Sequence, residues 1–239
     1  MDALSHAFLI YALMVAIGRP DLAAFAILGA VIPDIDVLFR RASHRSPRLY
    51  IFTHGGFTHS LLGASLLAAL VYAAAGASAV IAPLSPFSGV PFGLLPLAAV
   101  IAGAWSHLAF DYLASPGIPL LYPLSDRKYT LNIFAGPSMV MFVMSISYLV
   151  LLLLGRASLA DIPLFAAAFL VLLAARAALK VSVLRRVDGT VFPTPHALKW
   201  ISIADRENEI HLKRYHCLRG ADPATIFPKF LNITPPETE

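Results

Sequence analysis

Long apolar stretches alternate with short polar segments through residues 57–183 of the chain. A helix that crosses a bilayer needs about 20 consecutive apolar residues. Stretches that meet or approach this length lie at residues 57–82, 90–114, 133–154 and 162–183. The pattern therefore predicts a membrane-spanning helix at each of these places.

The N-terminal part carries two shorter apolar stretches, at residues 4–17 and 22–39, separated by the polar sequence Gly18-Arg19-Pro20-Asp21. We interpret the two stretches as a helical hairpin, formed either by two short spans or by a re-entrant pair. Backbone polar groups inside a bilayer must be satisfied by the protein or by a polar cavity. We therefore expect the rest of the chain to shelter this hairpin.

The character of the sequence changes after residue 183. Residues 199–203 and 210–215 alternate apolar and polar side chains, with polar residues between them, which predicts a β-hairpin. An isolated hairpin is marginally stable in water, so we expect it to pack on the loops above the spans. The predicted fold is an all-α polytopic membrane protein with about six hydrophobic helices, the first two short. Its membrane-embedded domain, residues 1–183, precedes a small C-terminal domain, residues 184–239, that contains the hairpin.

Composition agrees with a membrane protein. Hydrophobic residues make up 58% of the chain and charged residues 13%, whereas soluble domains carry about 25% charged residues. The single cysteine, Cys217, excludes an intramolecular disulfide and a cysteine-based zinc site. The net charge of +4 raises the question of nucleic acid binding. No basic run is interleaved with aromatic residues, so we expect no nucleic acid partner.

The distribution of basic residues predicts the orientation. With six crossings, the N-terminus, the loops at residues 40–56 and 115–132 and the C-terminal domain share one side of the membrane. That side carries Arg40, Arg41, Arg45, Arg48, Arg127, Lys128, Arg185 and Arg186, and the other carries only Arg19 and Arg156. Because basic loops stay in the cytoplasm, we expect a multi-pass protein of the inner (cytoplasmic) membrane with a cytoplasmic C-terminus. The sequence predicts no oligomeric state.

Ionisable side chains gather at the cytoplasmic ends of the predicted spans. They are His6, Asp34, Asp36, His54, His59, His107 and Asp111. Ionisable groups next to hydrocarbon are costly, so such residues indicate a functional site. Histidine and aspartate together form the ligand set of hydrolytic zinc or manganese centres. The pattern therefore predicts a metal centre on the cytoplasmic side.

Spacing supports this interpretation at two motifs. His107 and Asp111 are four residues apart and lie on one helix face, where they can chelate a metal or, alternatively, form a hydrogen-bonded pair at a helix end. In Pro33-Asp34-Ile35-Asp36, one carboxylate can bind metal while the other orients a histidine. The alternative for this motif is an ordinary turn.

The glycine-containing loop His54-Gly55-Gly56-Phe57-Thr58-His59-Ser60 is the third motif. Glycines permit a tight turn and a close backbone approach, and His59 would lie in the first turn of the following helix. One of the two histidines can serve as a proton donor to a leaving group rather than as a ligand. The alternative is a capped loop with two incidental histidines.

Together these motifs resemble the YdjM-type membrane-bound metal-dependent hydrolases. The resemblance rests on the N-terminal histidine, residues 29–36, the loop at residues 54–60, residues 105–111 and residues 116–124. It implies a hydrolase. A fainter similarity connects the histidine–aspartate helix pair to zinc-dependent phospholipase C.

We therefore expect an integral-membrane metal-dependent hydrolase at the membrane–cytoplasm interface. Metal-activated water would cleave a phospholipid or another lipid phosphoester, so the expected partners are membrane lipid and an amphiphilic substrate. The expected cofactor is one to three divalent ions, zinc in the first place and manganese as the alternative. The expected roles are metal ligation by His6, Asp36, His59, His107 and Asp111, catalysis by His54 and Asp34, and substrate binding by Arg45, Arg48 and Arg127.

Two other classes of function fit the same residues less well. Transport sites usually lie near the bilayer midplane, whereas these polar residues gather at one end of the spans, which argues against a divalent-metal transporter. A non-catalytic membrane scaffold would leave the seven residues without a role.

Overall fold

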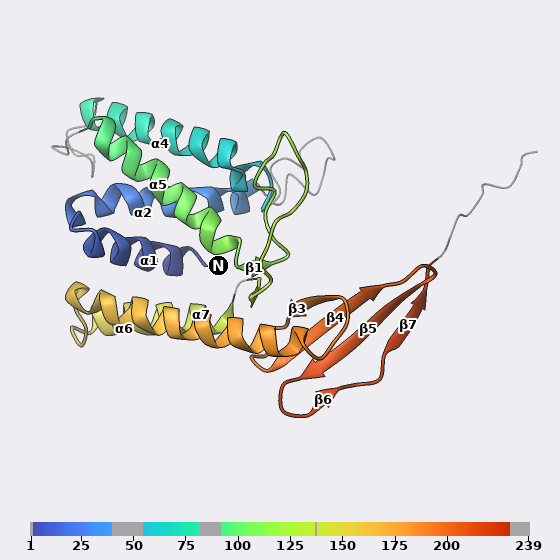
Figure 1. Ribbon diagram of the computed structural model, residues 1–239. Coiled ribbons are helices and arrows are strands. Elements are labelled where there is room, and N and C mark those ends of the chain that lie inside the picture. Colours follow the sequence, from blue (N-terminus) through green and yellow to red (C-terminus); the bar gives the residue numbers. More distant parts are fainter. Residues whose placement is uncertain (1, 40–54, 82–91, 137, 230–239) are drawn as a thin grey trace, which may run out of the picture.

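The computed structural model describes residues 2–39, 55–81, 92–136 and 138–229. Within these residues the chain forms six α-helices followed by an antiparallel β-sheet (Figure 1). The helices are α1 (Ala3–Ala16), α2 (Ala23–Val31), α4 (Leu61–Ile81), α5 (Leu94–Asp111), α6 (Met139–Leu153) and α7 (Ile162–Leu184). They lie roughly side by side, and the sheet extends beyond one end of the bundle (Figure 1).

Among the residues that the structure describes, three segments are long and apolar enough to cross a membrane. They are Leu61–Ser78, Leu94–Asp111 and Leu159–Leu184, and α1 and α6 are shorter apolar helices. The 14 residues of α1 rise about 21 Å, which is less than the hydrocarbon core of about 30 Å. The first hairpin is therefore short, as its sequence predicts.

The predicted span at residues 133–154 was wrong at its N-terminal end. Strand β2 (Phe134–Ala135) pairs in parallel with β1 (Ala114–Ser115), which directly follows α5. Helix α6 begins only at Met139, where Ser138 caps its first turn. The apolar residues 133–135 belong to the connection between α5 and α6.

The short helix α1 is sheltered inside the bundle. It contacts α2, α5, α6 and α7. Phe8 makes edge-to-face contacts with Tyr148 of α6 and Phe165 of α7, at centroid distances of 5.0 and 5.3 Å. These contacts bury one face of α1, so neighbouring helices cover much of the element whose length does not match a bilayer.

Helices α2 and α5 approach each other at two glycines. A Cβ on Gly29 would lie 1.8 Å from the Val100 carbonyl oxygen, and a Cβ on Gly103 would lie 2.0 Å from the Ala26 carbonyl oxygen. Small residues at such contacts let the backbones of membrane helices touch. The fixed distance between α2 and α5 sets the position of the polar residues at their ends.

The C-terminal sheet contains β3 (Thr190–Pro193), β4 (Lys199–Asp205), β5 (Glu209–His216), β6 (Gly220–Ala221) and β7 (Thr225–Pro228). Strands β4 and β5 pair antiparallel, with Trp200 opposite Tyr215. This confirms the predicted hairpin. Trp200 and Tyr215 form a small core with Val183 of α7 and Val191 of β3, so the sheet packs on the end of the last helix.

Basic side chains of α7 connect the sheet to the segment that precedes α6. Arg176 donates hydrogen bonds to the carbonyl oxygens of Ile133 and Ala197, and its guanidinium lies 4.5 Å from the centroid of the Trp200 ring. Lys180 donates to the carbonyl oxygen of Leu131. Arg176 is buried, so these contacts fix the sheet and the connection against the same helix.

Candidate metal centre

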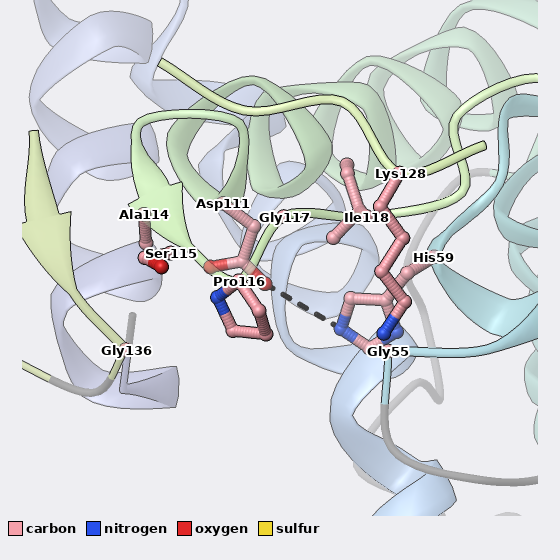
Figure 2. A pocket seen from close by; sticks show the side chains of 10 residues that line it. All are labelled: Gly55, His59, Asp111, Ala114, Ser115, Pro116, Gly117, Ile118, Lys128 and Gly136. Atoms are coloured by element: carbon pink, nitrogen blue, oxygen red, sulfur yellow. Dashed lines mark ion pairs between the residues drawn. The ribbon is translucent and has the colours of Figure 1, made fainter. Parts of the chain in front are cut away.

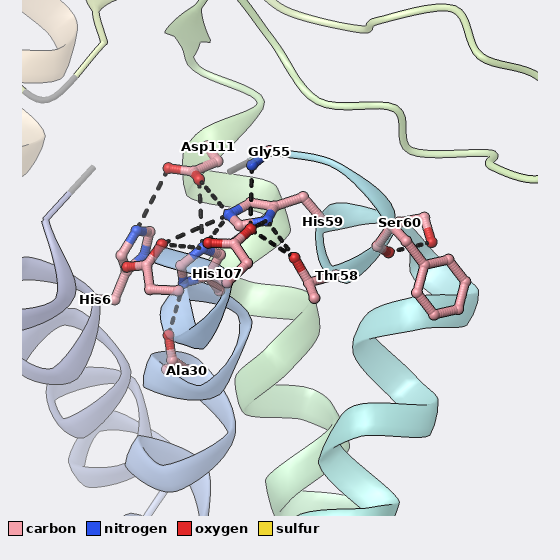
Figure 3. Close-up of polar contacts among 11 residues, drawn as sticks. His6, Ala30, Gly55, Thr58, His59, Ser60, His107 and Asp111 are labelled. Atoms are coloured by element: carbon pink, nitrogen blue, oxygen red, sulfur yellow. Dashed lines mark hydrogen bonds and ion pairs between the residues drawn. The ribbon is translucent and has the colours of Figure 1, made fainter. Parts of the chain in front are cut away.

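Four separate parts of the chain bring histidines and carboxylates together at the end of the bundle that carries the sheet (Figures 1 and 3). His6 lies in the first turns of α1, and the two aspartates lie in the 3₁₀ helix Ile32–Phe39 that follows α2. His59 ends the 3₁₀ helix Phe57–His59 before α4, and α5 supplies His107 and Asp111. The side chains of His6, Asp36, His59, His107 and Asp111 are all buried.

The orientation of His107 is fixed by the backbone of α2. Its Nδ1 lies 2.7 Å from the carbonyl oxygen of Ala30. A carbonyl only accepts hydrogen bonds, so Nδ1 carries the proton and the Nε2 of the neutral ring presents its lone pair. The close contact between α2 and α5 thus determines which nitrogen of His107 faces the site.

A carboxylate orients His59 in the same way. The Nδ1 of His59 lies 3.2 Å from Asp36 Oδ2 and 3.0 Å from the Thr58 hydroxyl. That hydroxyl donates to the same Asp36 oxygen at 2.7 Å, and the backbone N–H of Gly55 donates to it at 3.2 Å. Asp36 therefore holds a proton on Nδ1 and leaves the Nε2 of His59 to face the cluster as a candidate metal ligand. This arrangement is typical of metal-binding histidines.

The two Nε2 atoms point at each other, 3.2 Å apart (Figure 3). Two lone pairs at this distance repel unless a proton or a cation lies between them. Asp34 Oδ1 lies 3.6 Å from each of these nitrogens. Asp111 Oδ2 lies 3.5 Å from His59 Nε2 and 3.3 Å from His107 Nε2. One oxygen of each aspartate therefore lies within 3.6 Å of both nitrogens.

These separations match the edges of a metal coordination tetrahedron. Zinc bonds to histidine nitrogen and carboxylate oxygen measure about 2.0–2.2 Å, which makes the edges of a regular tetrahedron about 3.3–3.6 Å. Five of the six separations among these four atoms range from 3.2 to 3.6 Å. The donor set of two imidazoles and two carboxylates suits zinc or manganese. The residues present therefore fit a divalent cation.

The raised pKa of His59 also indicates a site that favours positive charge. Burial of the ring disfavours its charged form, but its contacts with Asp34 and Asp36 outweigh this effect and raise the pKa of His59 to about 9. The surrounding carboxylates thus favour positive charge at this point of the structure, and a proton or a divalent cation supplies it.

A cavity of about 160 Å³ opens beside this cluster (Figure 2). Its lining residues are Gly55, His59, Asp111, Ala114, Ser115, Pro116, Gly117, Ile118, Lys128 and Gly136. Among these, Lys128 is the one lysine or arginine. An anionic group that enters the cavity therefore meets the Lys128 ammonium as well as the His59 and Asp111 side chains of the cluster.

The geometry divides the two aspartates differently from the sequence-based expectation. Asp34, expected as a catalytic group, faces the converging nitrogens, whereas Asp36, expected as a metal ligand, lies behind His59 and orients it. Sequence reasoning missed the contribution of Thr58, although its position next to His59 was a signal.

Of the three arginines expected to bind the substrate, the structure describes only Arg127. The guanidinium of Arg127 lies 5.6 Å from the centroid of the Tyr129 ring, and Arg127 is not among the residues that line the cavity. Its neighbour Lys128 lines the cavity instead. Arg45, Arg48 and His54 lie outside the described residues.

Comparison with known proteins identifies a family. The model of the protein family described as YdjM inner membrane protein matches residues 1–184, which include all the residues of the cluster. No curated protein and no solved structure matches the chain.

Proposed function

The chain belongs to the YdjM inner membrane protein family, and from this premise we propose that it is a membrane-embedded metal-dependent hydrolase of lipid phosphoesters. The observation that carries the proposal is that Asp34 Oδ1 and Asp111 Oδ2 each lie within 3.6 Å of both His59 Nε2 and His107 Nε2, beside a cavity. A structural histidine–aspartate pair needs no such arrangement.

These four side chains would hold a divalent cation, zinc or manganese. When bound, such a cation lowers the pKa of a coordinated water toward 7 and stabilises negative charge on a phosphoryl oxygen. Asp36, Thr58 and the Ala30 carbonyl keep the two imidazoles in their ligand tautomers. The protein thus supplies a rigid set of donors whose open side faces the cavity.

Lys128 would bind the phosphate of the substrate. Its ammonium borders the same cavity as His59 and Asp111, and charge-assisted hydrogen bonds to phosphate oxygens are short and strong. Hydrolysis then breaks the phosphorus–oxygen ester bond: the oxygen of water joins phosphorus, and the ester oxygen leaves as the alcohol. Lys128 offsets the negative charge of the phosphoryl group while this exchange occurs.

A second cavity supports a lipid rather than a water-soluble substrate. It measures about 330 Å³ and is lined by Leu61, Trp105, Leu108, Ala109, Tyr112, Leu120 and Tyr129. Both cavities border the segment between α5 and α6: Ile118 and Lys128 line the first, and Leu120 and Tyr129 line the second. An amphiphile with its phosphate at Lys128 and a tail among these apolar side chains would contact both.

The test is turnover of lipid phosphoesters by the purified protein in lipid nanodiscs. We expect release of phosphate or of a phosphorylated headgroup that stops with a chelator and resumes when Zn²⁺ or Mn²⁺ is restored. Asp111→Asn should abolish turnover, and His211→Ala in strand β5 should not change it. The absence of metal-dependent turnover across glycerophospholipids and isoprenoid phosphates would remove the proposed substrate class.

A further inference from the structure

His6 is a buried histidine whose ring nitrogens have no hydrogen-bond partner among the described residues. Its side chain is completely buried in the first turns of α1. Leaving a buried polar group without a partner costs about 1–3 kcal/mol. A neighbouring serine, Ser5, is equally buried but bonds to Asp2 and Ser145. Ser5 therefore has hydrogen-bond partners at this end of α1, whereas the ring nitrogens of His6 make no hydrogen bond to the described residues.

The ring of His6 is nevertheless held in one place and aimed at the cluster. It stacks on the ring of His107, with centroids 3.9 Å apart and an interplanar angle of 22°. Its Nε2 lies 3.4 Å from Asp111 Oδ1, within ion-pair distance but without hydrogen-bond geometry. This distance also matches the edge of about 3.3–3.6 Å between two ligands of one zinc ion.

Asp111 presents its two oxygens to two different sets of nitrogens. Oδ2 faces His59 and His107, and Oδ1 faces His6 (Figure 3). A carboxylate used in this way can bridge two cations. In two-metal hydrolytic sites the ions lie about 3.5–4 Å apart, a separation that one bridging carboxylate can span.

We propose that the centre holds two divalent cations bridged by Asp111, and that His6 is a ligand of the second. This inference rests on the proposed metal site and adds its nuclearity. The donor atoms of His6, His107 and Asp111 lie within 4.8 Å of one another, and so do those of Asp34, His59 and His107. The Nε2 of His107 can bind only one ion. We assign it to the ion that Asp34 and His59 would hold, which leaves His6 and Asp111 for the second ion.

The second ion would therefore have few protein ligands. His6 Nε2 and Asp111 Oδ1 supply two positions, and water or the phosphate of the substrate would fill the others. An ion held by fewer protein ligands binds more weakly, so we expect the His6 ion to be the first one lost on dialysis. Its open positions give the substrate phosphate a place to bind next to the first ion.

The test counts Mn²⁺ ions bound to the detergent-purified, full-length protein and records their electron paramagnetic resonance spectrum. We expect two ions per chain with an exchange-coupled signal in the wild type. His6→Phe keeps a stacked ring of similar size but removes both nitrogens, so it should bind one ion with an uncoupled six-line signal. His6→Ala should behave alike, and His211→Ala should keep two coupled ions.

The outcomes separate this inference from the proposed function. One ion in the wild type, lost in His107→Ala, would overturn the two-ion centre and leave the hydrolase proposal standing. Two coupled ions that persist in His6→Phe would overturn the role of His6. No bound ion in a folded wild type would overturn both.

Discussion

At the scale of single residues, His59 contacts two carboxylates that have different places in the proposed metal site. Its Nδ1 contacts Asp36 and its Nε2 faces Asp34. Partners that orient a ligand typically contribute 10–100-fold to metal affinity. We expect Asp36→Asn to weaken Zn²⁺ binding about 10–100-fold without changing the number of ions, and Asp34→Ala to weaken it further. Competition with a chromophoric chelator measures both, and a larger loss in Asp36→Asn would reverse the assignment.

The neighbours Arg127 and Lys128 offer a second comparison at this scale. Only Lys128 lines the cavity, whereas Arg127 lies over the Tyr129 ring. A hydrogen bond to a charged group contributes about 1.5–3 kcal/mol, or about 10–100-fold in rate. We expect Lys128→Met to lower turnover of a lipid phosphoester by that factor with metal content unchanged. The matched variant Arg127→Met should retain activity; equal losses in the two would argue against a specific phosphate contact.

The sequence predicts the membership of the cluster better than its internal roles. His107 and Asp111 lie four residues apart on a helix, so their common face follows from helix geometry alone. Asp34 and Asp36 lie in a 3₁₀ helix whose orientation depends on the contact of α2 with α5. The local pattern therefore cannot decide which carboxylate faces the nitrogens and which one lies behind His59.

At the scale of helices, the contact between α2 and α5 positions the residues of the site. A Cβ on Gly103 would lie 2.0 Å from the Ala26 carbonyl oxygen, so Gly103→Ala must push the helices apart. We expect a loss of stability of about 1–3 kcal/mol or more, together with weaker metal binding because the Ala30 carbonyl would move from His107. The control is Gly76→Ala, whose Cβ would meet only the side chain of Phe92, at 3.3 Å.

Thermal unfolding in detergent and metal titration measure the effect of these two glycine variants. Similar curves for Gly103→Ala and Gly76→Ala would show that the α2–α5 contact does not position the site. The sequence alone does not reveal this contact, because glycine and alanine are frequent along all of its apolar stretches.

The attachment of the C-terminal sheet is a second feature at this scale. Arg176 stacks on Trp200 and bonds to the carbonyl oxygens of Ile133 and Ala197. We expect Arg176→Met to destabilise the packing of the sheet on α7 by about 2–4 kcal/mol. Limited proteolysis should then release the sheet faster than in the wild type. The rate for Arg176→Lys should lie between those of Arg176→Met and the wild type. Unchanged proteolysis would mean that the small core around Trp200 suffices.

The helix boundaries show where hydropathy is informative and where it is not. Apolar length predicts α4, α5 and α7. It fails before α6, where Phe134 and Ala135 pair with the strand after α5 although they are as apolar as a membrane helix. A composition window cannot distinguish residues that face lipid from residues that face the protein.

At the scale of the whole molecule, the start of α1 and the end of α5, which carry His6, His107 and Asp111, lie at the end of the bundle from which the C-terminal sheet extends (Figure 1). The excess of basic residues predicts that this end is cytoplasmic. In a Cys217→Ser background, a membrane-impermeant maleimide added to intact cells should label Ala160→Cys, between α6 and α7, and not Leu218→Cys, in the turn between β5 and β6. Both positions are exposed.

Permeabilised cells provide the control for this experiment, since both cysteines should then react. Labelling of Leu218→Cys in intact cells would place the sheet and the metal centre on the opposite side of the membrane. The substrate would then have to come from the outer leaflet.

The central claim, that His59 and His107 are ligands of one metal centre, is tested most directly by the metal content of the purified protein. Mass spectrometry of the wild type, His59→Ala, His107→Ala and His211→Ala should find bound Zn²⁺ or Mn²⁺ in the wild type and in His211→Ala. Both site variants, folded as judged by gel filtration, should lose it. Unchanged metal content in both His59→Ala and His107→Ala would contradict the shared site.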